Sequence, residues 1–143
     1  MSYLEKINIS ALIGMALIIA WYASAIVPQL DNVPVEEISY GKKMIIAIIA
    51  HVVFVIGASI LIAIKDRNGL NGKFESGDER DRRLEVRADA IGGNILSALI
   101  VPSLIMLMMD VQAFWIANAL FLSLALTAML SFVIKAIDYR RGI

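Results

Sequence analysis

Four polar or kinked positions in otherwise apolar stretches are the residues of this chain that could do chemistry inside a membrane. His51 is the only histidine, and Trp21, Ser103 and Asn118 stand in three other apolar stretches. Counted at a rise of about 1.5 Å per helical residue, all four lie roughly 8 to 10 Å from the outer ends of their segments. An ionisable residue inside a membrane is by default a functional candidate. The four side chains could line a polar site with His51 as proton acceptor or ligand contact. Equally, one bond to a neighbouring helix would satisfy a neutral histidine with no function.

A second set of candidate residues lies in the charged segment SGDERDRRLEVRADA, residues 76–90. Placed at about 100° intervals on a helix, its side chains separate into three stripes. Leu84 and Ala88 begin an apolar seam that continues in Ile91 and Ile95, with acids along one flank and arginines along the other. Such a seam can pack against a neighbour with the same stripes, each acidic row meeting a basic row. The candidate interaction residues are Asp78, Arg80, Asp81, Arg83, Leu84, Glu85, Arg87, Ala88 and Asp89.

Two other interpretations of the charged segment stay open. The charges could form a solvated face stitched by the i,i+4 pairs Asp78 with Arg82 and Glu79 with Arg83, each worth a few tenths of a kcal/mol. The acidic row could also offer oxygen ligands to a divalent cation. Because arginines interleave with these acids, we expect no metal, and nothing in the sequence calls for a cofactor.

The composition argues against several classes of function. With no cysteine and one histidine, the chain cannot assemble a thiolate site, a disulfide or a nucleophile held by a base and its orienting partner. It has no glycine-rich phosphate-binding loop. Acids cancel the bases along the charged segment, which argues against nucleic acid binding. We therefore expect a protein that is not an enzyme.

Four apolar segments must position all these residues. Of 143 residues, 59% are hydrophobic, which is more than one soluble core of this size uses. The stretches 7–27, 44–64, 91–109 and 113–134 each approach or exceed the roughly 20 residues that a helix needs to cross a bilayer. The predicted fold is all-α, a single polytopic membrane domain over 1–143 with four transmembrane helices in two hairpins. A charged cytoplasmic helix should extend the third, starting at a capping box formed by Ser76 and Glu79, with the connection and charged helix together covering 65–90.

The basic residues predict the orientation. All of them except Lys42 and Lys43 lie at the N-terminus, in residues 65–90 or in the tail from Lys135 onward. Cytoplasmic segments of membrane proteins are enriched in lysine and arginine. We expect a multi-pass protein of the cell's inner membrane with both termini in the cytoplasm and the tail returning to water.

One stripe of small residues indicates helix packing. Ala119, Ser123, Thr127 and Ser131 recur at every fourth position of the last apolar stretch. Small residues at this spacing let two helix backbones approach closely in a membrane. The stripe is therefore expected to face a neighbouring helix.

The charged segment also carries a family resemblance. The run Asp78, Glu79, Arg80, Asp81, followed by Leu84, Glu85, Arg87 and Ala88 and an apolar helix, resembles the D-E-R-D segment of small uncharacterised bacterial and archaeal integral membrane proteins, classed as a domain of unknown function. The match spans roughly residues 77–110. Aromatic residues often follow the alanine in those proteins, whereas this chain has Gly92, Gly93 and Asn94 there. The resemblance implies a non-enzymatic membrane protein, sometimes considered regulatory.

Two functions from different classes follow. The first is a regulatory or accessory protein of the lipid bilayer that forms a homo-oligomer or docks a membrane-protein partner through the charged helix. The alternative is a small oligomeric channel or transporter with a polar site in the outer half of the membrane. We favour the first function. A single histidine is a poor proton relay, and no apolar segment has an ionisable residue in its inner half.

Overall fold

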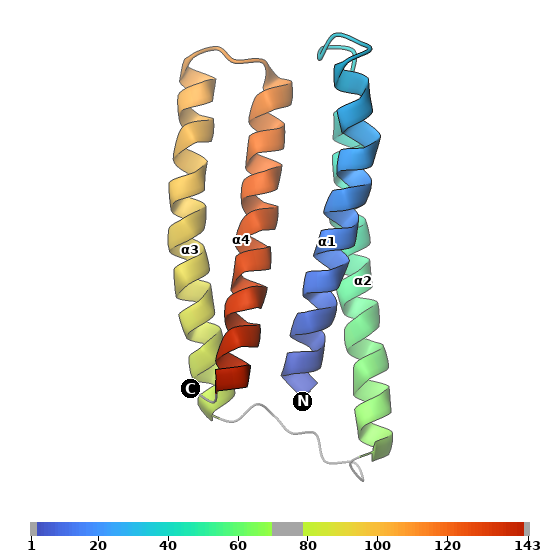
Figure 1. Cartoon of the computed structure of the whole chain (residues 1–143), viewed down its shortest axis with the longest axis vertical. Coiled ribbons are helices and arrows are strands. Elements are labelled where there is room, and N and C mark those ends of the chain that lie inside the picture. The colour runs from blue at the N-terminus through green and yellow to red at the C-terminus, as the bar shows by residue number, and fades with distance from the viewer. Residues whose placement is uncertain (1–2, 70–78, 142–143) are drawn as a thin grey trace.

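Four long α-helices make up the part of the chain that the computed structural model describes, residues 3–69 and 79–141 (Figure 1). They are α1 (Tyr3–Leu30), α2 (Tyr40–Gly69), α3 (Glu79–Met108) and α4 (Ala113–Arg141). Each contains a stretch of 26 to 28 residues that is long and apolar enough to cross a membrane. Such a stretch measures about 40 Å, against a hydrocarbon core of about 30 Å. The predicted all-α fold with four potential membrane-crossing helices is confirmed, and this is the architecture of a multi-pass membrane protein.

The helices run further than the apolar stretches that predicted them. α1 passes through Pro28 and ends at Leu30, since a proline in the last turn removes only one backbone hydrogen bond. The other helices add polar turns at their ends, where lysine, arginine and glutamate are good helix formers. The capping box predicted at Ser76 lies outside the described residues.

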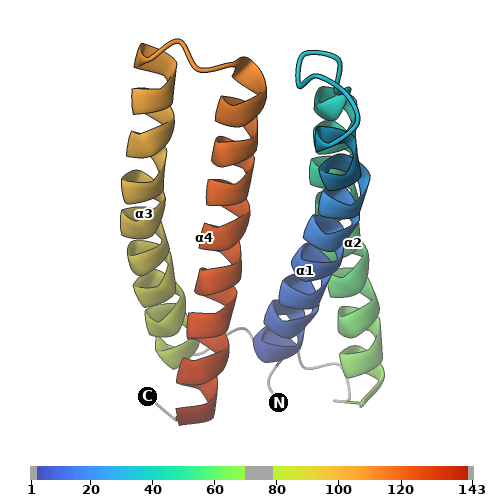
Figure 2. The same cartoon turned by 45° about the horizontal axis from the view of Figure 1, so that its top comes forward.

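The helices stand in the order α2, α1, α4, α3 (Figure 1, Figure 2). α1 packs along both α2 and α4, and α4 packs along both α1 and α3. α2 and α3 therefore each have one extensive neighbour. Large apolar side chains of α2 such as Ile49, Val53 and Leu61 are exposed, as suits contact with lipid.

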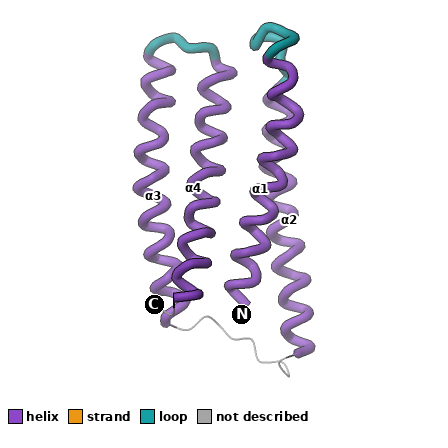
Figure 3. Tube along the Cα trace, viewed as in Figure 1, coloured by secondary structure: helices purple, strands orange, loops and turns teal. Residues whose placement is uncertain are grey.

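Apolar packing holds the end of the bundle that carries the two described connections, 31–39 and 109–112, which we call the turn end (Figure 3). The tilted rings of Tyr22 and Phe121, with centroids 4.8 Å apart, join α1 to α4 there. Ile38 of the first connection is buried in the same cluster. The remaining buried members are Ile26, Ala47 and Phe114, so α1, α2 and α4 share this core.

A compact turn joins α3 to α4. The amide of Val111 donates to the carbonyl of Met106 at 3.0 Å, and that of Asp110 donates to the carbonyl of Leu107 at 3.3 Å. Asp110 has a φ of 53°. This is the Schellman arrangement, in which one left-handed residue ends a helix and satisfies its last carbonyls.

The predicted small-residue stripe of α4 faces α3. Ser123 and Thr127 are buried, and the Ser123 hydroxyl lies 3.5 Å from the carbonyl oxygen of Leu99. A Cβ atom added at Gly92 would stand 2.4 Å from the Ser131 hydroxyl oxygen. The absence of a side chain at Gly92 thus lets the two backbones approach closely at this level.

Candidate functional site: a charged surface on α3

The apolar seam of the charged segment is covered by the chain itself. At the end of the bundle opposite the turn end, which we call the charged end, Leu84 is 3% exposed and Ala88 is fully buried. Ile91 and Ile95 continue the seam and are half-buried. Because α4 is the one extensive neighbour of α3, these side chains pack towards α4. The seam is therefore not available in this form to a second molecule.

Two ion pairs join α3 to α4 beside the seam. The Arg87 guanidinium lies 3.7 Å from the Asp138 carboxylate, and Lys135 Nζ lies 3.2 Å from Asp89 Oδ1. Asp138 is almost completely buried, with a side chain 6% exposed, whereas the Arg87 side chain is 54% exposed. The flanks of the seam therefore act within one molecule, and they fix the first turns of α3 on α4.

Asp138 and Lys135 make the contacts of α4 with the charged part of α3, and neither is among the residues predicted from the sequence. Asp138 lies in the tail that is predicted to return to water, and its side chain is buried within the bundle. The spacing of Asp138 in the sequence indicates its position. Asp138 lies seven residues beyond Ser131, which is two helical turns further along the face that packs against α3.

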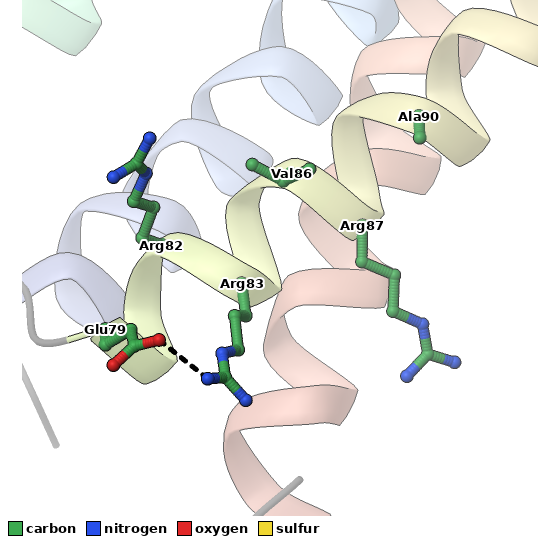
Figure 4. Close-up of a pocket in the computed structure, with 6 residues that line it drawn as sticks. All are labelled: Glu79, Arg82, Arg83, Val86, Arg87 and Ala90. Carbon is green, nitrogen blue, oxygen red and sulfur yellow. Dashed lines mark hydrogen bonds and ion pairs between the residues drawn. The ribbon is translucent and has the colours of Figure 1, made fainter.

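The outward side of the same helix forms what we call the arginine surface, made by Glu79, Arg82, Arg83, Val86, Arg87 and Ala90. These residues line a hollow of about 380 Å³. In Figure 4 the three arginine side chains leave α3 in different directions, with Val86 between Arg82 and Arg87 and Ala90 further along the helix beyond Arg87. Val86 is 63% exposed. The surface thus combines a small apolar centre with cationic groups around it.

The arginine surface has an excess of positive charge. Arg83 pairs with Glu79 at 2.6 Å, with both side chains about four-fifths exposed, and exposed pairs of this kind contribute little. Arg82 has no ion pair with any described residue. Arg87 shares its charge with the buried Asp138. Arg82 is therefore the guanidinium group of this surface that has no carboxylate partner among the described residues.

The other predicted interaction residues are only partly described. Glu85 and Asp89 are exposed, and Asp89 holds Lys135. Asp78 and the side chains of Arg80 and Asp81 lie outside the described part of the chain. Within that part, no group of three or more histidine or acidic side chains is placed to hold a metal ion.

The predicted polar layer around His51 is not joined into one cluster. Trp21 is 45% exposed, whereas Ser103 is buried. The Ser103 hydroxyl and His51 Nδ1 have no hydrogen-bond partner among the described residues. The amide of Asn118 donates to the carbonyl of Phe114, and its oxygen accepts a 2.8 Å bond from the Tyr22 hydroxyl.

Trp21 is the residue of α1 predicted to line the polar layer, yet its neighbour Tyr22 makes the hydrogen bond to Asn118. Adjacent residues point about 100° apart on a helix, so only one of them can face α4. Tyr22 is 4% exposed and Trp21 is 45% exposed. The bond between α1 and α4 therefore runs through the residue whose ring also packs on Phe121.

Comparison of the chain with protein-family models, with curated proteins and with solved structures found no match. Its function is therefore inferred from its own geometry.

Proposed function

We propose that this chain is a non-enzymatic interaction protein of the inner membrane, in which the arginine surface docks an acidic segment of a partner protein. The carrying observation is that α3 is fixed to α4 by its buried seam and by the Arg87 and Asp89 ion pairs. The opposite side of that helix is consequently held in place while it stays exposed. A preorganised surface binds with a smaller entropic cost than a flexible one.

The charge distribution supports a cytoplasmic location for this surface. The charged end carries Lys6, Lys65, Lys135 and Arg140 in addition to the three arginines of the surface. The turn end carries the two lysines Lys42 and Lys43, and Lys43 donates to the backbone carbonyl of Ala25 at 3.1 Å. For two antiparallel hairpins, the positive-inside rule then places both termini in the cytoplasm. The charged extension of α3 would then stand at the cytoplasmic boundary of the bilayer.

The chemistry of the surface favours an acidic partner over a second copy of the chain. Two copies meeting through it would bring like-charged arginines together, and such juxtaposition is strongly unfavourable at an interface. An amphipathic acidic helix offers the complementary pattern. Its carboxylates can bind the planar guanidinium groups in a bidentate manner, and its apolar side can cover Val86 and Ala90.

The test uses the purified protein in nanodiscs of uncharged lipid, titrated with an acidic amphipathic helical peptide. Arg82→Glu with Arg83→Glu should weaken binding by more than about tenfold. Neither residue pairs with another helix, so the reversal spares the packing, whereas reversal of Arg87 would also disturb Asp138. Arg140→Glu changes an exposed arginine at the same end of the bundle and should leave affinity within about twofold.

Equal losses in the double reversal and in Arg140→Glu would reduce the effect to general electrostatics and would contradict a defined docking surface. The mass of the purified protein in mild detergent gives an independent answer. A defined homo-oligomer that dissociates on reversal of Arg82 and Arg83 would replace partner docking with self-association.

A further inference from the structure

A second cavity lies at the charged end, and Glu85 is its lining residue from α3. It measures about 150 Å³, and all four helices contribute to its wall. Sites for drug-sized ligands run from about 300 Å³ upward. Its size fits a small polar head group rather than a whole soluble ligand.

The cavity is apolar at one end and charged at the other. Its deep wall is formed by Ala11 of α1, Val55 of α2 and the ring of Phe132 of α4. Val55 precedes Lys65, near the end of α2, by ten positions, which places it about 15 Å deeper along the helix. Glu85 of α3 and Lys135 of α4 line the same cavity within a few turns of their helix ends at the charged end. The change from apolar to charged lining runs in the same direction as the change from acyl chain to head group in a membrane lipid.

The rim of the cavity carries both signs of charge. The Lys135 side chain is only 18% exposed, and its ammonium group uses one contact on Asp89, leaving further N–H donors. Glu85 makes no ion pair with a described residue. Tyr139 of α4 lines the cavity on the charged side of Lys135, and aromatic faces attract ammonium groups. A simple anion would meet the Glu85 carboxylate, and a simple cation would meet Lys135.

We propose that this cavity binds a phospholipid with a zwitterionic head group, taken from the membrane leaflet that surrounds the charged end of the bundle. The lipid phosphate lies at Lys135, its ammonium lies between Glu85 and Tyr139, and the start of its acyl chains lies against Ala11 and Val55. Asn8 belongs to the wall as well, but its amide donates to the backbone carbonyl of Phe132 at 2.8 Å. Asn8 thus closes the interface between α1 and α4 beside the lipid.

Native mass spectrometry of the full chain tests this site, with phosphatidylethanolamine and phosphatidylglycerol of identical acyl chains added to the detergent. One phosphatidylethanolamine per chain should be retained at least about tenfold more than phosphatidylglycerol. Glu85→Gln keeps the shape of an exposed side chain and should abolish this preference. Val55→Phe fills the apolar wall without changing charge and should reduce retention of both lipids. Lys42→Ala, at the turn end, is the matched control and should change nothing.

Several outcomes would overturn the proposal. Equal retention of the two lipids by the wild-type chain would exclude recognition of a zwitterion. Retention that neither Glu85→Gln nor Val55→Phe alters would place the lipid elsewhere. Displacement of the lipid by free phosphoethanolamine at equal concentration would assign the site to a soluble phosphate compound.

Discussion

The ion pair between Arg87 and Asp138 should be strongly asymmetric in its response to mutation. At 3.7 Å and an effective dielectric constant near 20, the gross attraction of two unit charges is about 4.5 kcal/mol. Arg87 is more than half exposed, so solvent screening lowers its net contribution considerably. Arg87→Ala leaves a buried carboxylate without its counter-charge and should cost about 2 kcal/mol of unfolding free energy. Asp138→Ala leaves an arginine that water can solvate and should cost less than about 1 kcal/mol.

Both effects can be measured by following the loss of helical circular dichroism as SDS is titrated into dodecyl maltoside micelles. The double variant Arg87→Ala with Asp138→Ala should be as stable as Asp138→Ala alone to within about 0.5 kcal/mol, because the two side chains are coupled. A cost for Asp138→Ala equal to or above that of Arg87→Ala would refute the account. It would show that the carboxylate stabilises the bundle through contacts other than Arg87.

The same unfolding measurement checks three further changes. Gly14→Ala puts a Cβ atom 2.4 Å from Cδ1 of Phe54 and should cost about 1 to 3 kcal/mol through overpacking of α1 on α2, whereas Gly57→Ala, with nothing within 4 Å, should not destabilise the bundle. Tyr22→Phe removes the bond to Asn118 and should cost about 0.6 kcal/mol, as interhelical bonds in membranes do; no loss would show that the amide finds another donor. Asp110→Val places a branched side chain at a φ of 53° and should cost about 1 to 3 kcal/mol, while Asp110→Gly should be tolerated, and equal tolerance of both would refute the Schellman turn.

The sequence was sufficient for the helices because a long apolar run has few alternatives to a helix in a bilayer. The sequence also predicted that Leu84 and Ala88 lie on one apolar face of the helix, since burial on one face follows the helical period. The identity of the packing partner does not follow from periodicity. A seam flanked by acids and bases looks the same whether it faces α4 or a second molecule, and only the position of Asp138 decides between them.

The polar layer around His51 shows a second limit of sequence reasoning. Depth along each helix can be counted from the sequence, but the rotation of each helix about its axis is set by packing. Trp21 and Asn118 have similar predicted depths, yet Trp21 faces outward while Asn118 meets Tyr22. A rotation of about 100°, one residue, separates the two outcomes.

Photo-crosslinking from position 86 in native membranes is the most direct test of the arginine surface as a docking site. A photoreactive amino acid in place of Val86 stands at the centre of that surface. We predict one discrete adduct with a different protein, which disappears on Arg82→Glu with Arg83→Glu and persists on Arg140→Glu. An adduct of twice the 15.7 kDa chain mass, or adducts with lipid alone, would contradict the proposed function.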